Sequence, residues 1–261
     1  MLFLNPGTAT GEGAMITGVA ELLTELEKRE LNKAHAHVRY WFRGQSKAGW
    51  ALQPAVYRDG FGQYMNEADR FKTESHLYQD FRLSSAGIRT GRESDADIYF
   101  LQQHYRMPTR LLDWTNNALA ALYFVCAEHD GEDGELFVMD AYQLSKIDGI
   151  ATSRRSVFRD AVKAVADWLS PDGLPEFIFP VRPDHFDRRM SLQRSCFTFH
   201  VPKEKVLMPT NYNSVVSLRV SGPHKRKIVR QLSLLGMDHF SVYGDLEHLA
   251  KTLTEAYTSQ N

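Results

Sequence analysis

The chain has 261 residues, of which 43% are hydrophobic and 24% are charged, and its formal net charge at pH 7 is -1. These values are ordinary for a globular protein, and the length allows one large domain or two small ones. Because the charges nearly balance, no overall field would attract nucleic acid or an anionic membrane, although a local basic patch would. No apolar run approaches the roughly 18 residues of a membrane span and no leader opens the chain, so we expect a cytoplasmic protein with no membrane contact.

Hydrophobic periodicity and caps predict an alternation of helices and strands. Asn66 and Ser94 are the expected N-caps of two helices, and Pro108 ends the second of these. In the first half we expect a helix at about 16–33, a strand at 37–42, helices at 67–83 and 95–105, an extended segment at 109–113, and a helix over 118–125. In the second half we expect a strand at 135–139, a helix at 156–169, strands at 177–181, 196–201 and 215–220, and helices at 223–235 and 246–256.

No repeat, low-complexity tract or shift in composition marks a domain boundary. The sequence therefore predicts the α+β class, as a single mixed domain with a central, largely antiparallel sheet flanked by helices. Residues 1–34 are expected to form an N-terminal extension and helix, and residues 35–257 one compact domain. Cys126 and Cys196 lie in apolar runs and are expected to be buried, unbridged thiols in a reducing compartment. No cysteine or histidine has metal-ligand spacing, so we expect no metal.

The segment from Leu101 to Thr115 concentrates polar groups at the edge of an apolar run. His104, Arg110, Asp113 and Thr115 all fall within it. Such groups are costly to desolvate unless they are paired, so they form either an internal network or a pocket. In the first alternative, Arg110 and Asp113 form a buried ion pair that fixes the corner between strand and helix. His104 would then interact with the C-terminal dipole of its helix.

Two further groups have an ordinary interpretation beside a functional one. Four aromatic residues are expected in the core rather than stacked on bases, namely Trp41, Phe42, Trp50 and Trp114. A basic run after Pro223 is either a solvated helix face or a patch that contacts the phosphates of a nucleic-acid partner. It consists of Lys225, Arg226, Lys227 and Arg230.

Four motifs in order carry a resemblance to a known family. They are Tyr40-Trp-Phe-Arg-Gly-Gln45 with Trp50, Leu52, Pro54 and Arg58; His104-Tyr-x-x-Pro-Thr-Arg-Leu-Leu-Asp-Trp-Thr115 with Ala120-Ala-Leu-Tyr-Phe124; Arg189 and Gln193 with Phe197-Thr198; and Leu235-Gly236 with Asp245-Leu246-Glu247. Together they resemble the FRG domain from about residue 38 to residue 253. That family usually has glycine before the Pro-Thr-Arg run, where Arg106-Met107 stands here. The resemblance implies a bacterial toxin or phage-defence protein, with an antitoxin or defence-system partner.

A strand ending in aromatic-Arg43-Gly44 also resembles the first motif of ADP-ribosyltransferases, in which the arginine holds the dinucleotide. Gly44 would let a ligand approach the backbone. The strand ending at Thr115, followed by a helix, is compatible with the next motif. The last motif is an acidic residue that opens a strand, and Gln193 stands there. A glutamine offers only a dipole, so Asp113, Glu247 or the substrate would have to supply the negative charge.

This second resemblance implies an NAD-consuming ADP-ribosyltransferase-like or NAD glycohydrolase-like enzyme, with NAD as substrate and an acceptor that is protein, nucleic acid or water. Arg43 would grip the pyrophosphate, and His104 and Arg110 would line the pocket. Thr115 would bind the nicotinamide ribose or orient Gln193 at the reacting carbon. Asp113 would position Arg110 or Arg43. Two alternatives stay open: a non-catalytic module that binds a nucleotide or a partner, and a nuclease-type toxin.

Overall fold

A six-stranded sheet in the order β4-β5-β2-β1-β3-β6 is the centre of the fold, and each neighbouring pair of strands is antiparallel. The computed structural model describes residues 15–29, 39–58, 60–61, 65–128, 131–145, 154–167, 177–183, 188–200, 206–207 and 214–258. The strands are β1 (Tyr40–Gln45), β2 (Leu111–Thr115), β3 (Gly134–Asp140), β4 (Phe179–Val181), β5 (Ser195–Phe199) and β6 (Val215–Val220). The predicted α+β class with an antiparallel sheet is confirmed.

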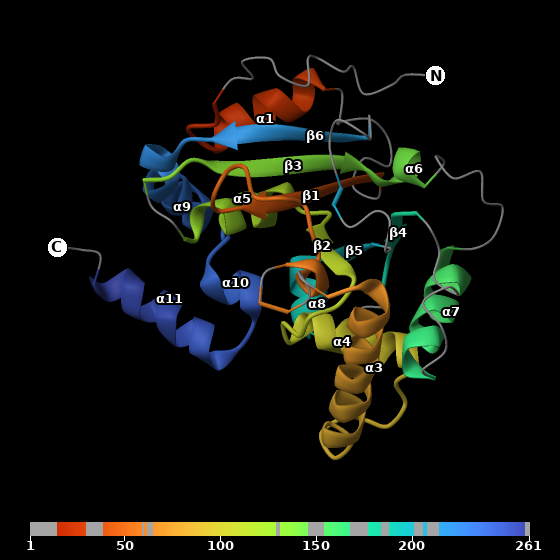
Figure 1. Cartoon of the computed structure of the whole chain (residues 1–261). Coiled ribbons are helices and arrows are strands. Elements are labelled where there is room, and N and C mark those ends of the chain that lie inside the picture. Colours follow the sequence, from red (N-terminus) through yellow and green to blue (C-terminus); the bar gives the residue numbers. More distant parts are fainter. Residues whose placement is uncertain are drawn as a thin grey trace.

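The sheet opens between its two middle strands. β1 pairs with β3 along its whole length, and β2 pairs with β5 along its whole length. β1 and β2, in contrast, pair only where Phe42 lies opposite Thr115. Figure 1 shows β6, β3 and β1 side by side, with β2, β5 and β4 turned away below them. The two halves of the sheet therefore part from each other beside Phe42.

Helices cover both halves of the sheet (Figure 1). α5 packs on β1 and β3 with α9 behind it, while α3, α4 and α7 enclose an aromatic-rich core against β4 and β5. The helical elements are α1 (Val19–Lys28), η1 (Ala55–Tyr57), α3 (Glu67–Ser84), α4 (Asp95–His104), α5 (Ala118–Cys126), α6 (Ala141–Leu144), α7 (Arg154–Ala166), α8 (Arg188–Gln193), η3 (Gly222–His224), α9 (Lys225–Leu234), α10 (His239–Tyr243) and α11 (Leu246–Thr258).

Side-chain caps fix where the helices around the open part of the sheet begin. Asn66 Oδ1 accepts from the Asp69 amide at 2.9 Å, and Ser94 forms a reciprocal capping box with Asp97. Asn117 Oδ1 accepts from the Leu119 amide at 3.0 Å and starts α5 directly after β2. The caps expected from the sequence, Asn66 and Ser94, are confirmed.

Some elements differ from their predicted limits. β1 was expected at 37–42 but continues through Arg43 and Gly44, because β3 pairs with it as far as Gln45. The short helices α6, α8 and α10 are too brief to show a hydrophobic period, and the sequence did not predict them. Most of residues 1–34 lies outside the described part of the chain, and the compact domain at 35–257 stays a prediction.

The two cysteines are buried and neither forms a disulfide, as predicted. Burial raises the pKa of the Cys196 thiol to about 11. Within the described ranges, every helix is too short or too polar to cross a bilayer.

Candidate functional site

A cavity of about 790 Å³ lies where β1 and β2 part. This volume is within the usual range for sites that bind small molecules and cofactors. Its walls come from β1, the end of α4, β2, the end of α5, α8 and the start of β5, with Tyr243 of α10. Six of the seven predicted site residues line it, namely Arg43, Gly44, His104, Asp113, Thr115 and Gln193.

Arg43 is a largely buried cation with few partners. Its side chain is 14% exposed, and its Nη1 donates to the backbone carbonyl of Asp113 at 2.8 Å. The Asp113 carboxylate is 3.9 Å away, and Nε is buried without a hydrogen-bond acceptor in the described part of the chain. Burial, partly opposed by Asp113, lowers the pKa of Arg43 to about 10, so the group remains charged at neutral pH. An anionic ligand would complete its bonding.

Thr115 connects β2 to the end of α8. Its hydroxyl donates to the backbone carbonyl of Gln193 at 2.6 Å and accepts from the Asn117 amide at 3.0 Å. Gln193 is the last residue of α8, and its Nε2 is buried with no acceptor among the described residues. One of the two roles expected for Thr115, orienting Gln193, agrees with this geometry. A ligand carbonyl or hydroxyl in the cavity could accept from Nε2.

Asp113 lies at the surface of the cavity, with its side chain 59% exposed. Its Oδ2 accepts from Gln103 Nε2 at 2.8 Å, and its nearest cation is Arg43. Asp113 therefore supplies a carboxylate beside Arg43. His104 ends α4 and also lines the cavity, so the helix-terminus position and the pocket position expected for it coincide.

Arg110 lies elsewhere, in the core between β2 and α3. It is fully buried and is not one of the residues that line the cavity. Its guanidinium forms ion pairs of 2.7 Å with both Glu74 and Glu67 and donates to the Tyr57 hydroxyl at 2.6 Å. Burial lowers the pKa of Arg110, but the charge of Glu74 and its neighbours outweighs burial and raises it overall. The expected ion pair with Asp113 is wrong, because α3 brings two glutamates to Arg110.

The missing side chain of Gly44 makes room for a helix rather than for a ligand. A Cβ on this residue would lie 2.0 Å from the carbonyl oxygen of Ala121 and 2.9 Å from a methyl group of Val125. Both belong to α5, so the missing side chain allows α5 to pack on β1. The expectation that Gly44 opens the backbone to a ligand is corrected accordingly.

The cavity also contains residues to which the sequence analysis gave no site role. Arg58 and Arg189 were part of the quoted motifs, but nothing in their spacing indicated that they would meet Arg43 in one cavity. Trp50, expected in the core, is 47% exposed and lines the cavity, whereas Trp41 and Trp114 are buried as expected. Arg106 has a positive φ of 62°, and Glu128 and Tyr243 complete the charged and aromatic wall.

The predicted basic patch is smaller than expected. Lys225 is fully buried, and its ammonium donates to the carbonyls of Ser46 and Glu128, which joins α9 to the end of β1. Arg226, Lys227 and Arg230 are exposed on α9 and do not line the cavity. Glu247, one candidate source of negative charge, is exposed on α11 and is likewise outside the cavity lining.

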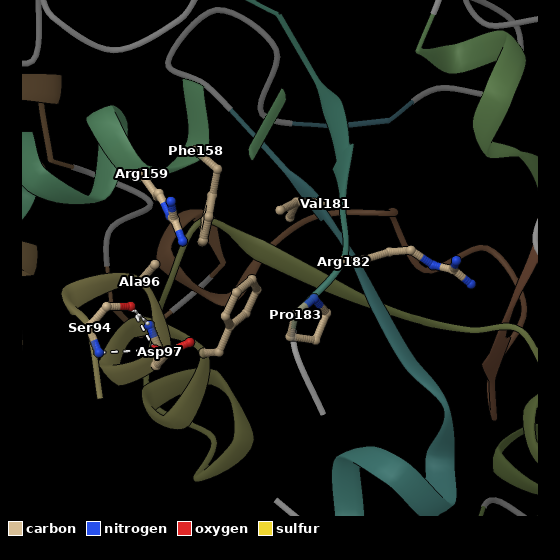
Figure 2. A pocket seen from close by; sticks show the side chains of 9 residues that line it. Ser94, Ala96, Asp97, Phe158, Arg159, Val181, Arg182 and Pro183 are labelled. Carbon is tan, nitrogen blue, oxygen red and sulfur yellow. Dashed lines mark hydrogen bonds between the residues drawn. The ribbon is translucent and has the colours of Figure 1, made fainter. Parts of the chain in front are cut away.

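A second cavity beside the start of α4 is far smaller, about 10 Å³, which is room for a single water. Figure 2 shows its lining from α4, α7 and the end of β4, where Ser94 and Asp97 are occupied by their mutual hydrogen bonds. Across the described residues there is no cluster of three His, Cys, Asp or Glu side chains suited to a metal ion. The cavity between β1 and β2 is therefore the candidate site.

Comparison with known proteins places part of this site in a family. No curated protein and no solved structure matches the chain significantly. The family model of the FRG domain matches residues 38–134. This segment runs from β1 to the start of β3 and includes Arg43, His104, Asp113 and Thr115, whereas Gln193 lies beyond it. The resemblance to the FRG domain that the sequence motifs indicate is therefore confirmed over residues 38–134.

Proposed function

We propose that this protein is an NAD-consuming enzyme of the ADP-ribosyltransferase type, which acts in the cytoplasm as a bacterial toxin or phage-defence effector. One observation carries the proposal: Arg43, Thr115 and Gln193 come from three separate segments and line a single cavity large enough for a nucleotide. These are the residues that the resemblance to ADP-ribosyltransferases assigns to the dinucleotide, the ribose and the reacting carbon.

The pyrophosphate of NAD suits the Arg43 end of the cavity. Arg43 presents a desolvated positive charge with an unused Nε donor, and Arg58 lies in the same wall. A guanidinium can hold phosphate oxygens through two parallel hydrogen bonds, which fixes orientation as well as charge. The dinucleotide would thereby gain a defined direction in the cavity.

The reaction breaks the bond between the ribose carbon and the nicotinamide nitrogen, and the electron pair leaves with nicotinamide. A nucleophilic oxygen or nitrogen of the acceptor bonds to the same carbon and loses its proton, and water in this role gives hydrolysis. Gln193, held by Thr115, would hydrogen-bond the ribose. Asp113 is the carboxylate of β2 that would oppose the positive charge developing on the sugar.

One feature favours a second candidate function, a non-catalytic nucleotide-binding module. The neutral Gln193 stands where the transferase resemblance implies an acid, and the Asp113 carboxylate is more than half exposed, which weakens its field. A module of this kind would bind the nucleotide through Arg43 and release no product.

The test is nicotinamide release by the purified protein, with NAD affinity measured in parallel by calorimetry. We expect release by the wild type and a loss of roughly 10- to 100-fold in NAD affinity for Arg43→Met, since a hydrogen bond to a charged group is worth about 1.5–3 kcal/mol. Arg82→Met, an exposed arginine of α3 outside the cavity lining, is the matched control. Neither release nor NAD binding by the wild type would overturn the proposal, and binding without release would favour the module.

Gln193→Glu separates the two candidates further. A carboxylate at this position should speed nicotinamide release by roughly 10-fold or more, because it stabilises positive charge on the ribose. In a binding module the same change would leave release undetectable.

A further inference from the structure

Gln45 is the last residue of β1 and carries a buried acceptor without a donor. The residue is 5% exposed and lines the cavity between β1 and β2. Its Nε2 donates to the Ala51 carbonyl at 3.4 Å, so Oε1 points away from that carbonyl, and Oε1 has no hydrogen-bond partner in the described part of the chain. A buried amide oxygen left without a donor is costly, and a donor on a ligand would remove that cost.

The pleat of β1 turns Gln45 to the same side of the sheet as Arg43. Successive side chains of a strand point to opposite faces, so residues two apart share a face. Gly44, between them, faces α5, because a Cβ there would lie 2.0 Å from the Ala121 carbonyl oxygen. Arg43 and Gln45 therefore face away from α5, and both line the cavity. One ligand can reach the guanidinium and the amide together.

The strand pairing places Arg43 between Gln45 and the part of the cavity proposed for the reacting ribose. Phe42 lies opposite Thr115, the last residue of β2, whose hydroxyl donates to the Gln193 carbonyl. Because β1 is antiparallel to β2, it runs from Phe42 toward Gln45 away from that end of β2, over roughly 10 Å at the rise of a strand. A dinucleotide with its reacting ribose at Gln193 and its pyrophosphate at Arg43 therefore brings its adenosine to Gln45.

The turn after β1 supplies an aromatic wall close to Gln45. The Gly49 amide donates to a carboxylate oxygen of Glu135 at 3.1 Å, which ties the turn to β3. Trp50 comes next and directly precedes Ala51, whose carbonyl bonds the Gln45 amide. Trp50 is 47% exposed and lines the cavity. A flat indole in this position offers an aromatic base a surface on which to pack.

We propose that Gln45 and Trp50 form the base subsite of this cavity and that Gln45 selects adenine. The inference rests on the proposed function, because it takes the pyrophosphate at Arg43 as its starting point. Gln45 Oε1 accepts a hydrogen bond from the exocyclic amine of adenine, and the base packs on Trp50. The terminal torsion of a glutamine is soft, so a small turn brings Oε1 to the entering amine. Hypoxanthine carries a carbonyl oxygen in place of that amine and would set two acceptors against each other.

The test compares adenosine diphosphate with inosine diphosphate by calorimetry, because these nucleotides differ in the base alone and neither contains nicotinamide. We expect the wild type to bind the adenosine nucleotide about 10-fold or more tightly, since a site that uses an N–H of its ligand rejects an analogue that lacks it. Gln45→Met should reduce this preference to within about twofold. Arg43→Met should weaken both nucleotides and keep their ratio, and Gln143→Met, on α6 outside the cavity lining, should change neither affinity.

Three results would overturn the inference: no binding of adenosine diphosphate by the wild type, equal affinities of the wild type for the two nucleotides, and a preference that survives Gln45→Met. The wild-type comparison needs no variant, so it decides the matter even if thermal unfolding shows that Gln45→Met folds poorly.

Nicotinamide mononucleotide tests the other amine of NAD, that of the carboxamide. If its affinity falls with Gln45→Met while that of adenosine diphosphate does not, nicotinamide lies at Gln45 and the inference fails. An adenine preference that depends on Gln45, in a protein that releases no nicotinamide, would leave the base subsite standing and contradict the proposed enzyme. Nicotinamide release without an adenine preference would do the reverse.

Discussion

Arg43 and Arg110 carry the same charge and differ in their surroundings. The Arg110 side chain is fully buried, whereas that of Arg43 is 14% exposed. Arg110 has an acceptor for each nitrogen of its guanidinium, with two carboxylates among them. Arg43 has one backbone carbonyl at hydrogen-bond distance, a carboxylate at 3.9 Å and a buried Nε without an acceptor in the described chain. Complete bonding indicates a role in the fold, and incomplete bonding beside a cavity indicates a role in binding.

The pKa values express the same difference. The carboxylates around Arg110 overcome burial and raise the pKa of its guanidinium, whereas burial prevails at Arg43 and lowers the pKa to about 10. The folded protein thus stabilises one of these charges internally and leaves the other for a ligand to neutralise. Four experiments test this contrast.

The largest effect is expected from Glu74→Gln in the Arg110 cluster. The change keeps the shape of the side chain but leaves a buried guanidinium with half of its carboxylate partners, and it also disturbs the hydrogen bond from the Tyr99 hydroxyl. Breaking a buried ion pair on one side costs about 3–5 kcal/mol of unfolding free energy. Urea unfolding measures the loss, with the exposed Glu255→Gln as control. A loss below about 1 kcal/mol would mean that Arg110 does not depend on its glutamates.

Gly44→Ala should have the next largest effect, on the packing beside Arg43. The added methyl group meets the Ala121 carbonyl at 2.0 Å, so α5 has to move from β1, and overpacking of this kind costs about 1–3 kcal/mol. Gly87→Ala is the matched control, because its Cβ would meet no atom within 4 Å. Unchanged stability of Gly44→Ala would return the residue to the ligand-approach role.

Arg43→Met should alter stability by less than about 1 kcal/mol. The substitution removes a desolvated charge whose partners compensate it incompletely, so the lost hydrogen bond to Asp113 is offset by relief of desolvation. Thermal and urea unfolding of the variant beside the wild type provide the measurement. A loss comparable to that of Glu74→Gln would erase the contrast between the two arginines.

The smallest effect is a pH dependence that belongs to the Arg110 side alone. Burial raises the pKa of Tyr57 in the folded protein, so its contribution to stability is complete below the unfolded pKa of about 10 and declines as the pH rises above it. At pH 10.5 the decline is roughly 0.8 kcal/mol. Tyr57→Phe should therefore lose less unfolding free energy than the wild type between pH 9 and pH 10.5. The exposed Tyr257→Phe serves as control, and equal slopes for all three proteins would contradict the expectation.

Local signals in the sequence predicted most of the fold. Caps such as Asn66 and Ser94 act within three residues, and the alternation of Val215–Val220 belongs to one strand, so both are visible without the rest of the chain. The extension of β1 through Arg43 and Gly44 is imposed by its pairing with β3, some 90 residues away, and no local pattern indicates it. The short helices α6, α8 and α10 were missed because they are too brief to show a hydrophobic period.

The motifs predicted part of the cavity lining. Six of the seven chosen residues line the cavity, and the exception shows the limit. Arg110 was assigned to the pocket, but it pairs with Glu67 and Glu74 of α3. No spacing in the sequence links these glutamates to Arg110, so the pairing could not be predicted. Lys225 is a similar case, since the carbonyls that bind its ammonium follow β1 and α5. Long-range partners of charged residues are fixed by tertiary packing, and the sequence alone does not reveal them.

The position of Arg43 on a central strand of the sheet has a consequence for the rate of ligand binding. β1 pairs with β3 along its whole length and is covered by α5, so its amide protons that bond to β3 should be among the slowest in the molecule to exchange with deuterium. An arginine carried by so rigid a strand loses little conformational entropy when a ligand arrives. Arg43 should therefore act as a preformed contact, and the rate of ligand association should be limited by diffusion of the ligand and not by ordering of a loop.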